Sequence, residues 1–113
     1  MSRSTDQCIA DILHAIDRCE RYVHALSSDD GDLVDMAEDA VERNLQIIGE
    51  AAKHLPAELT DAHPEIAWPQ IRGFRNILVH QYFGVDVTTV RDVVETHLPP
   101  LAAALRGTSR DLT

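Results

Sequence analysis

Residues 32–55 read DLVDMAEDAVERNLQIIGEAAKHL, and this stretch decides the fold class of the chain. Its apolar residues recur at spacings of mostly three and four, the period of one face of an α-helix. These residues are Val34, Val41, Leu45, Ile48, Ala52 and Leu55. Because Ala37, Ala40 and Ala51 widen the stripe, this helix is expected to contact more than one neighbour. Pro56 has no backbone N–H to continue the ladder, so the helix should end before it.

The segment before residue 32 predicts another long helix, over residues 5–26. Ser4 and Gln7 have the spacing of a capping box at its start. Its apolar face is made by Ile9, Ile12, Leu13, Ile16, Val23 and Leu26. Cys8 and Cys19 are eleven residues apart on this helix, which places them about 16 Å apart and excludes a disulfide within it. We expect two small buried thiols in a reducing cytoplasm.

Two further helices are predicted after residue 56. Residues 56–69 carry three prolines and are expected to form a loop with one short turn at most. Pro69 suits the first position of a third helix, whose buried face would be Ile71, Phe74 and Leu78. Asp86 is the expected cap of a fourth helix that ends at Gly107 and is kinked by Pro99–Pro100. Its core face would be Val87, Val90, Val94, Leu98, Leu101 and Leu105.

The periodicity therefore predicts an all-α bundle of four to five helices, in one domain over residues 1–113. Hydrophobic residues make up 44% of the 113, which suits a globular core. A core of this size is small, so oligomerisation is an expected further source of burial. No apolar leader and no run of about 18 apolar residues is visible, so we expect no membrane span and a cytoplasmic protein.

The net charge of −9 argues against a general affinity for nucleic acid, but the acids are unevenly placed. None occurs in residues 66–85, which carry +2 against −11 for the remainder of the chain. Arg72, Arg75 and His80 lie within this stretch. An anion would be attracted here and repelled elsewhere.

Arg75 and His80 together have the chemistry for cleaving RNA without a metal. Asn76 and His80 are four residues apart and share a helix face, which Arg75 flanks. An arginine holds phosphate bidentately, and a histidine exchanges a proton near neutral pH. A base removes the 2′-OH proton, the arginine stabilises the phosphorane, and an acid protonates the leaving 5′-oxygen. The spacing alone equally allows Arg75 to pair with an acid and His80 to sit at a helix C-terminus.

The motif Arg75-x4-His80-x-Tyr82, followed by Gly84-Val85-Asp86, resembles the R-x4-H-x-Y signature of HepT toxins in the HEPN superfamily. ERNLQIIGEAA (42–52) is similar to that family's second helix, and WPQIRGFRN (68–76) to its approach to the motif. The resemblance implies a helical bundle that forms homodimers, bringing two ribonuclease motifs into one cleft. It also implies an antitoxin, a small nucleotidyltransferase of the MNT type, that transfers AMP to the motif tyrosine, here Tyr82.

Other candidates are weaker. Glu50 is a candidate to orient Arg75 or His80. Arg72 is a candidate to bind a further backbone phosphate and so extend the phosphate track. Both side chains are equally compatible with simple exposure to solvent. Glu20 with His24, and Glu50 with His54, each offer two metal ligands where a site needs three or four. We therefore expect no metal and no cofactor. Trp68 and Phe74 are expected in the core.

The sequence thus predicts a metal-independent endoribonuclease that acts on RNA. Arg75, His80 and Asn76 would be its catalytic residues and Tyr82 its AMP acceptor. The alternative is a helical scaffold without activity that binds the nucleotidyltransferase, and the acidic net charge gives it weight.

Overall fold

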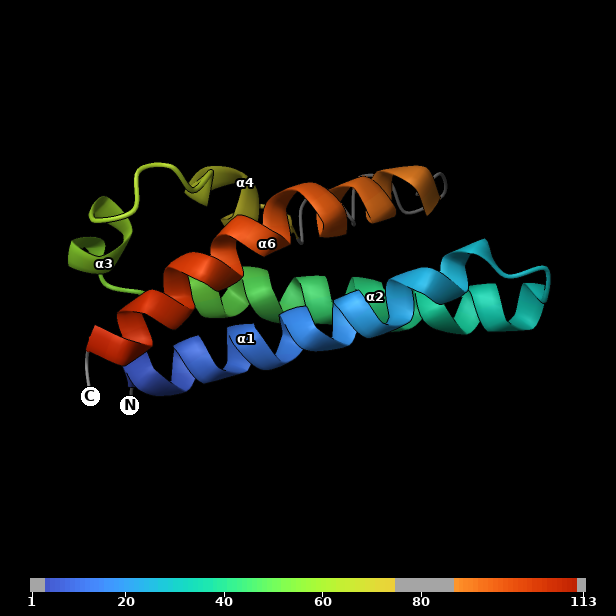
Figure 1. Ribbon diagram of the computed structural model, residues 1–113, viewed down its shortest axis with the longest axis horizontal. Coiled ribbons are helices and arrows are strands. Elements are labelled where there is room, and N and C mark those ends of the chain that lie inside the picture. The colour runs from blue at the N-terminus through green and yellow to red at the C-terminus, as the bar shows by residue number, and fades with distance from the viewer. Residues whose placement is uncertain (1–3, 75–86, 112–113) are drawn as a thin grey trace.

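The computed structural model describes residues 4–74 and 87–111, which are all helical or connecting turns, with no strand among them. Three long elements form the body: α1 (Thr5–Tyr22), α2 (Gly31–Ala52) and α6 (Val87–Asp111). Three short ones complete it: η1 (Val23–Ser27), α3 (Ala57–Asp61) and α4 (Trp68–Arg72). Figure 1 shows α1 and α2 as a hairpin, with α6 lying across it and α3 and α4 at the same side as α6. The predicted all-α class is confirmed.

Both helices of the hairpin begin at polar caps. The Ser4 hydroxyl accepts from the Gln7 N–H at 3.1 Å and the Ser4 N–H donates to Gln7 Oε1 at 3.3 Å, so the capping box is confirmed. A carboxylate oxygen of Asp30 accepts from the N–H groups of Asp32 and Leu33, and starts α2. The α-helix predicted to run to Leu26 ends at Tyr22, because the last turns tighten into the 3₁₀ helix η1.

The segment after α2 contains the one short turn that was predicted, but the helices on either side of it are shorter than predicted. α2 ends at Ala52, three residues before the predicted Leu55, and residues 53–55 form a turn. α3 is a full helical turn within the predicted loop. Pro69 lies in the first turn of α4, as expected, but α4 ends after five residues at Gly73.

α6 corrects one prediction and confirms another. Pro99 and Pro100 lie inside it, and in Figure 1 its two halves run in different directions. The predicted end at Gly107 is wrong, since the helix continues to Asp111. Gly107 does not have the positive φ of a helix-ending glycine. The next residue, Thr108, donates to the Ala104 carbonyl and bonds His63 Nε2 at 3.1 Å, which holds the last turns in place.

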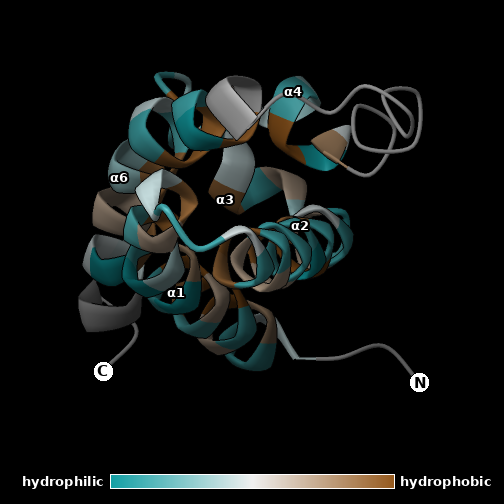
Figure 2. Cartoon of the chain, turned by 90° about the vertical axis from the view of Figure 1, so that its right-hand side faces the viewer, coloured by the Kyte–Doolittle hydropathy of each residue, from teal (hydrophilic) through white to brown (hydrophobic). Residues whose placement is uncertain are grey.

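The core lies between the three long helices, where their apolar faces meet (Figure 2). Its largest fully buried side chains include Ile12, Ile16, Leu45, Ile48, Leu98, Leu101 and Leu105. Leu78 lies outside the described residues. Cys8 and Cys19 are buried free thiols, as predicted. Burial, and then the neighbouring Glu20 charge, raise the pKa of Cys19 to about 12, so its thiol stays protonated.

Candidate functional site

The four motif residues Arg75, Asn76, His80 and Tyr82 lie outside the described residues. Their assigned roles therefore stay predictions. The structure does describe the segments on either side of the motif. α4 and Phe74 precede it, and α6 follows it.

Gly49 of α2 sets the position of the chain just before Arg75. A Cβ atom at Gly49 would lie 3.1 Å from the Ile71 carbonyl oxygen, 3.5 Å from Phe74 Cβ and 3.6 Å from the Arg72 carbonyl oxygen. Only glycine allows two backbones this close without a shift. Residues 71–74, which lead into the motif, therefore pack directly against α2.

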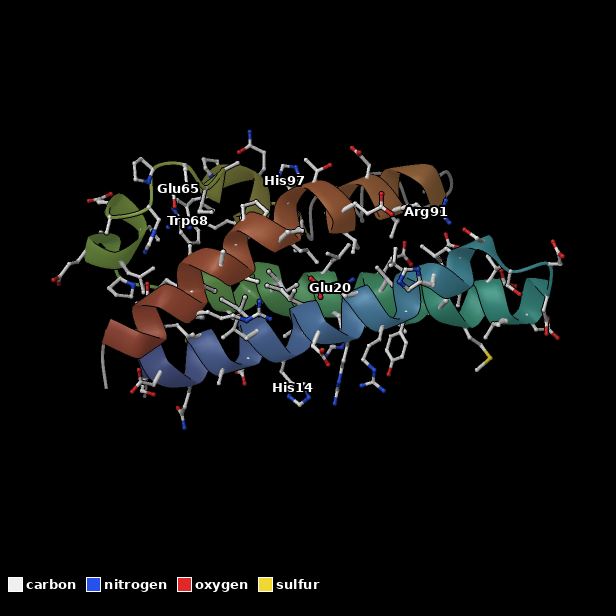
Figure 3. The ribbon with its side chains drawn as sticks, in the orientation of Figure 1. His14, Glu20, Glu65, Trp68, Arg91 and His97 are labelled. Atoms are coloured by element: carbon white, nitrogen blue, oxygen red, sulfur yellow. The ribbon has the colours of Figure 1, made fainter. Side chains whose placement is uncertain are left out.

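Phe74, the residue immediately before Arg75, is anchored on two sides. It is 2% exposed, and its ring centroid lies 6.2 Å from that of His97 on α6. Figure 3 shows His97 on the same side of the molecule as α4. The side chain of Trp68 is buried, and its indole N–H is shared between the carbonyls of Thr60 and His63. Trp68 and Phe74 thus belong to the core, as predicted, and fix α4 from both ends.

The start of α6, on the other flank of the motif, is tied to the tip of the hairpin. The Arg91 guanidinium donates to the Ser27 hydroxyl of η1, and Val90 and Val94 are buried in the core. Both chain segments that flank the motif therefore leave from fixed points.

The two supporting candidates lie near this approach. Glu50 follows Gly49, is exposed, and pairs with Lys53 at 3.3 Å. Arg72 ends α4 and is half-buried. Neither role, orienting the motif or extending the phosphate track, is tested by these positions.

A polar groove that the sequence reasoning missed runs along the seam between α1 and α2. One part, about 480 Å³, is lined by Asp11, Arg43, Gln46, Ile47, Glu50, Ala51 and His54. The second part, about 330 Å³, is lined by Asp11, His14, Ala15, Arg18, Asn44 and Ile47. Asp11 and Ile47 belong to both parts, so the groove is continuous. In the sequence, the groove corresponds to polar residues at helical spacing. A solvent-exposed helix face has the same pattern, so the pattern does not identify a groove.

The N-terminal half of α2 is strongly acidic by contrast. Burial, followed by repulsion from Asp35 and Asp39, raises the pKa of Glu38. Burial, followed by repulsion from Glu38 and Asp39, raises the pKa of Glu42. Such a surface repels a polyanion.

Among residues 4–74 and 87–111, no group of three or more His, Cys, Asp or Glu side chains is placed to hold a metal ion. In that same part of the chain, no helix combines the length and hydropathy needed to cross a membrane.

The comparisons with known proteins point to one family. The model of a family described as ribonuclease HepT-like matches residues 12–107. A probable ribonuclease HepT of Thermococcus cleftensis is 37% identical over 101 residues, which are 89% of this chain and 92% of that protein. A putative RNase of Caldanaerobacter subterraneus is 34% identical, over 78% of this chain and 81% of that protein. A gamma-glutamylcyclotransferase and putative RNase of Methanocaldococcus jannaschii is 38% identical over 80% of this chain but 40% of its own length. No solved structure matches the chain.

Proposed function

This chain belongs to the HepT-like ribonuclease family, and on that premise we propose that it is a toxin of the HepT/MNT type that cleaves RNA without a metal ion. The observation that carries the proposal is the family match over residues 12–107, which includes an intact Arg75-x4-His80-x-Tyr82 motif. The direct test is cleavage of RNA by the purified protein, which should be equally fast with and without EDTA. Loss of cleavage on chelation would contradict the metal-free chemistry.

In the proposed reaction, the 2′-oxygen of a ribose attacks the adjacent phosphorus and the P–O5′ bond breaks. His80 acts as the base that takes the 2′-OH proton or as the acid that protonates the leaving 5′-oxygen. Arg75 holds the scissile phosphate and stabilises the charge of the phosphorane, and Asn76 positions one of these groups. The products are a 2′,3′-cyclic phosphate and a 5′-hydroxyl, so no water and no metal enter this step.

Charge and packing support this assignment. The motif lies in the stretch without acids, residues 66–85, of a chain whose net charge is −9. Gly49, Phe74 and Arg91 fix the segments on either side of it. A stretch without acids in an acidic chain favours the binding of a polyanion there.

We expect the active form to be a homodimer. One chain carries one Arg–His set, whereas the reaction needs both a base and an acid, and two copies supply two imidazoles. Sedimentation at micromolar concentration should give the mass of two chains. A stable monomer that cleaves RNA at full rate would contradict this expectation.

We propose that AMP transfer to Tyr82 by an MNT-type nucleotidyltransferase silences the toxin. The added phosphate would compete with the scissile phosphate for Arg75 and would repel RNA. After co-expression with the nucleotidyltransferase, the intact mass should rise by one or more AMP units, and Tyr82→Phe should abolish the gain. An inhibited toxin of unchanged mass would instead indicate neutralisation by binding alone.

A further inference from the structure

The groove between α1 and α2 is a feature that the proposed reaction does not use. Its lining residues recur at helical spacing from Asp11 to Arg18 on α1 and from Arg43 to Ala51 on α2, and His54 lines it from the turn after α2. On α2 the lining spans eight residue steps, from Arg43 to Ala51, or about 12 Å. Figure 3 shows His14, one of the lining residues, pointing away from α6 on the outer side of α1. The groove is therefore on the side of the hairpin that α6 leaves uncovered.

The groove presents two exposed arginines although the chain is acidic. In the part of the chain that the structure describes, Arg18 and Arg43 make no hydrogen bond and no ion pair. The two acids of the groove, Asp11 and Glu50, are both already engaged in interactions. Two exposed guanidinium groups thus remain for an anionic ligand, and guanidinium binds phosphate bidentately.

Asn44 adds a buried side-chain amide in which only one of the two polar atoms has a hydrogen-bond partner among the described residues. Its side chain is 6% exposed, and its Nδ2 donates to the Ala40 carbonyl at 2.8 Å. Its Oδ1 is buried and has no hydrogen-bond partner among the described residues. Exchanging the two amide atoms would set oxygen against the Ala40 oxygen, so this orientation is the favoured one. A buried acceptor without a donor costs free energy, which a bound donor such as a ribose hydroxyl or a base amino group would recover.

The groove shares α2 with the contact that fixes the approach to the motif. Glu50 lines it, and the preceding residue, Gly49, is the one packed against the backbone of Ile71 and Arg72. Both features lie in the C-terminal half of α2, away from Asp35, Glu38 and Asp39.

We propose that this groove is a second RNA-binding site, in which Arg18 and Arg43 hold backbone phosphates of a single-stranded substrate beyond the cleaved bond. The partly exposed Ile47 supplies apolar surface for a base, and Asn44 receives a donor. The proposal rests on the ribonuclease function proposed above.

The test uses a fluorescent single-stranded RNA in which every ribose is 2′-O-methylated, because this RNA lacks the nucleophile and stays intact. Binding is measured by anisotropy for the full chain, for Arg18→Gln, for Arg43→Gln and for the double variant. Each single change should weaken binding about tenfold and the double change about a hundredfold. Each single change should also make the dependence of log K on log salt shallower by about 0.7, and the double change by about twice that. The matched control is Arg106→Gln, an exposed arginine of α6 outside the groove, which should bind within about twofold of the unchanged chain.

Equal binding by the unchanged chain and the double variant would overturn the groove proposal, while cleavage by the unchanged chain would still support the ribonuclease function. An unchanged chain that neither binds nor cleaves RNA would overturn the ribonuclease function itself. A double variant that sediments as a monomer where the unchanged chain is a dimer would also overturn the proposal, since the groove would then be an interface between two copies. Circular dichroism of each variant checks that the helices are retained.

Discussion

Replacing His80 or Arg75 by alanine is expected to abolish RNA cleavage. Loss of a general acid–base histidine costs roughly 10²–10⁴ in rate, and loss of a group that stabilises a charged transition state costs a similar factor. Arg75→Lys should recover only part of the activity, because lysine keeps the charge but loses the bidentate fork. Growth inhibition in cells should disappear in parallel with cleavage.

The measurement is initial cleavage rate of one RNA by the purified variants, with Arg106→Ala as a control of equal charge change. Thermal unfolding of each variant should show a cooperative transition like that of the unchanged chain. A rate for His80→Ala within about threefold of the unchanged chain would show that this histidine takes no part in the chemistry.

Gly49→Val is expected to reduce both stability and cleavage, although residue 49 is not proposed to touch RNA. Its Cβ would lie 3.1 Å from the Ile71 carbonyl oxygen, and valine adds two further methyl groups at that point. Forcing the helices apart costs about 1–3 kcal/mol. It also moves the chain that leads into Arg75, and a displacement of about 1 Å is enough to cost on the order of a hundredfold in rate.

Gly107→Val is the matched control, because no atom lies within 4 Å of a Cβ built at Gly107 and this glycine is also helical. The control should unfold and cleave nearly as the unchanged chain does. Chemical denaturation and the cleavage rate are measured for both variants. If Gly49→Val matched Gly107→Val in both, the close contact between α2 and α4 would have no role in positioning the motif.

The long helices could be predicted because their signals are local. The capping box at Ser4 and the apolar stripes of α1 and α2 depend on spacing within one helix, and the structure contains them. The end of α6 could not be predicted in this way. Its last turns are held by a hydrogen bond between His63 and Thr108, 45 residues apart, and Gly107 does not adopt the positive φ of a left-handed helix cap.

The same distinction applies to the candidate site: its motif could be found in the sequence, whereas the packing around it could not. The motif from Arg75 to Tyr82 was found by residue type, spacing and resemblance, and it lies outside the described residues. The role of Gly49 was not foreseen, because a glycine inside a helix shows nothing in sequence about which backbone packs on it. The groove was not foreseen because its polar lining has the same period as a solvated helix face.

The most direct test of the central claim is the chemistry of the cut ends. The purified protein is incubated with a short RNA in the presence of EDTA, and the products are identified by mass spectrometry. Attack by the 2′-OH, with His80 exchanging the proton and Arg75 holding the phosphate, predicts fragments that end in a 2′,3′-cyclic phosphate and begin with a 5′-hydroxyl. Intact RNA would favour the scaffold without activity, and fragments with 5′-phosphate ends would contradict the proposed mechanism.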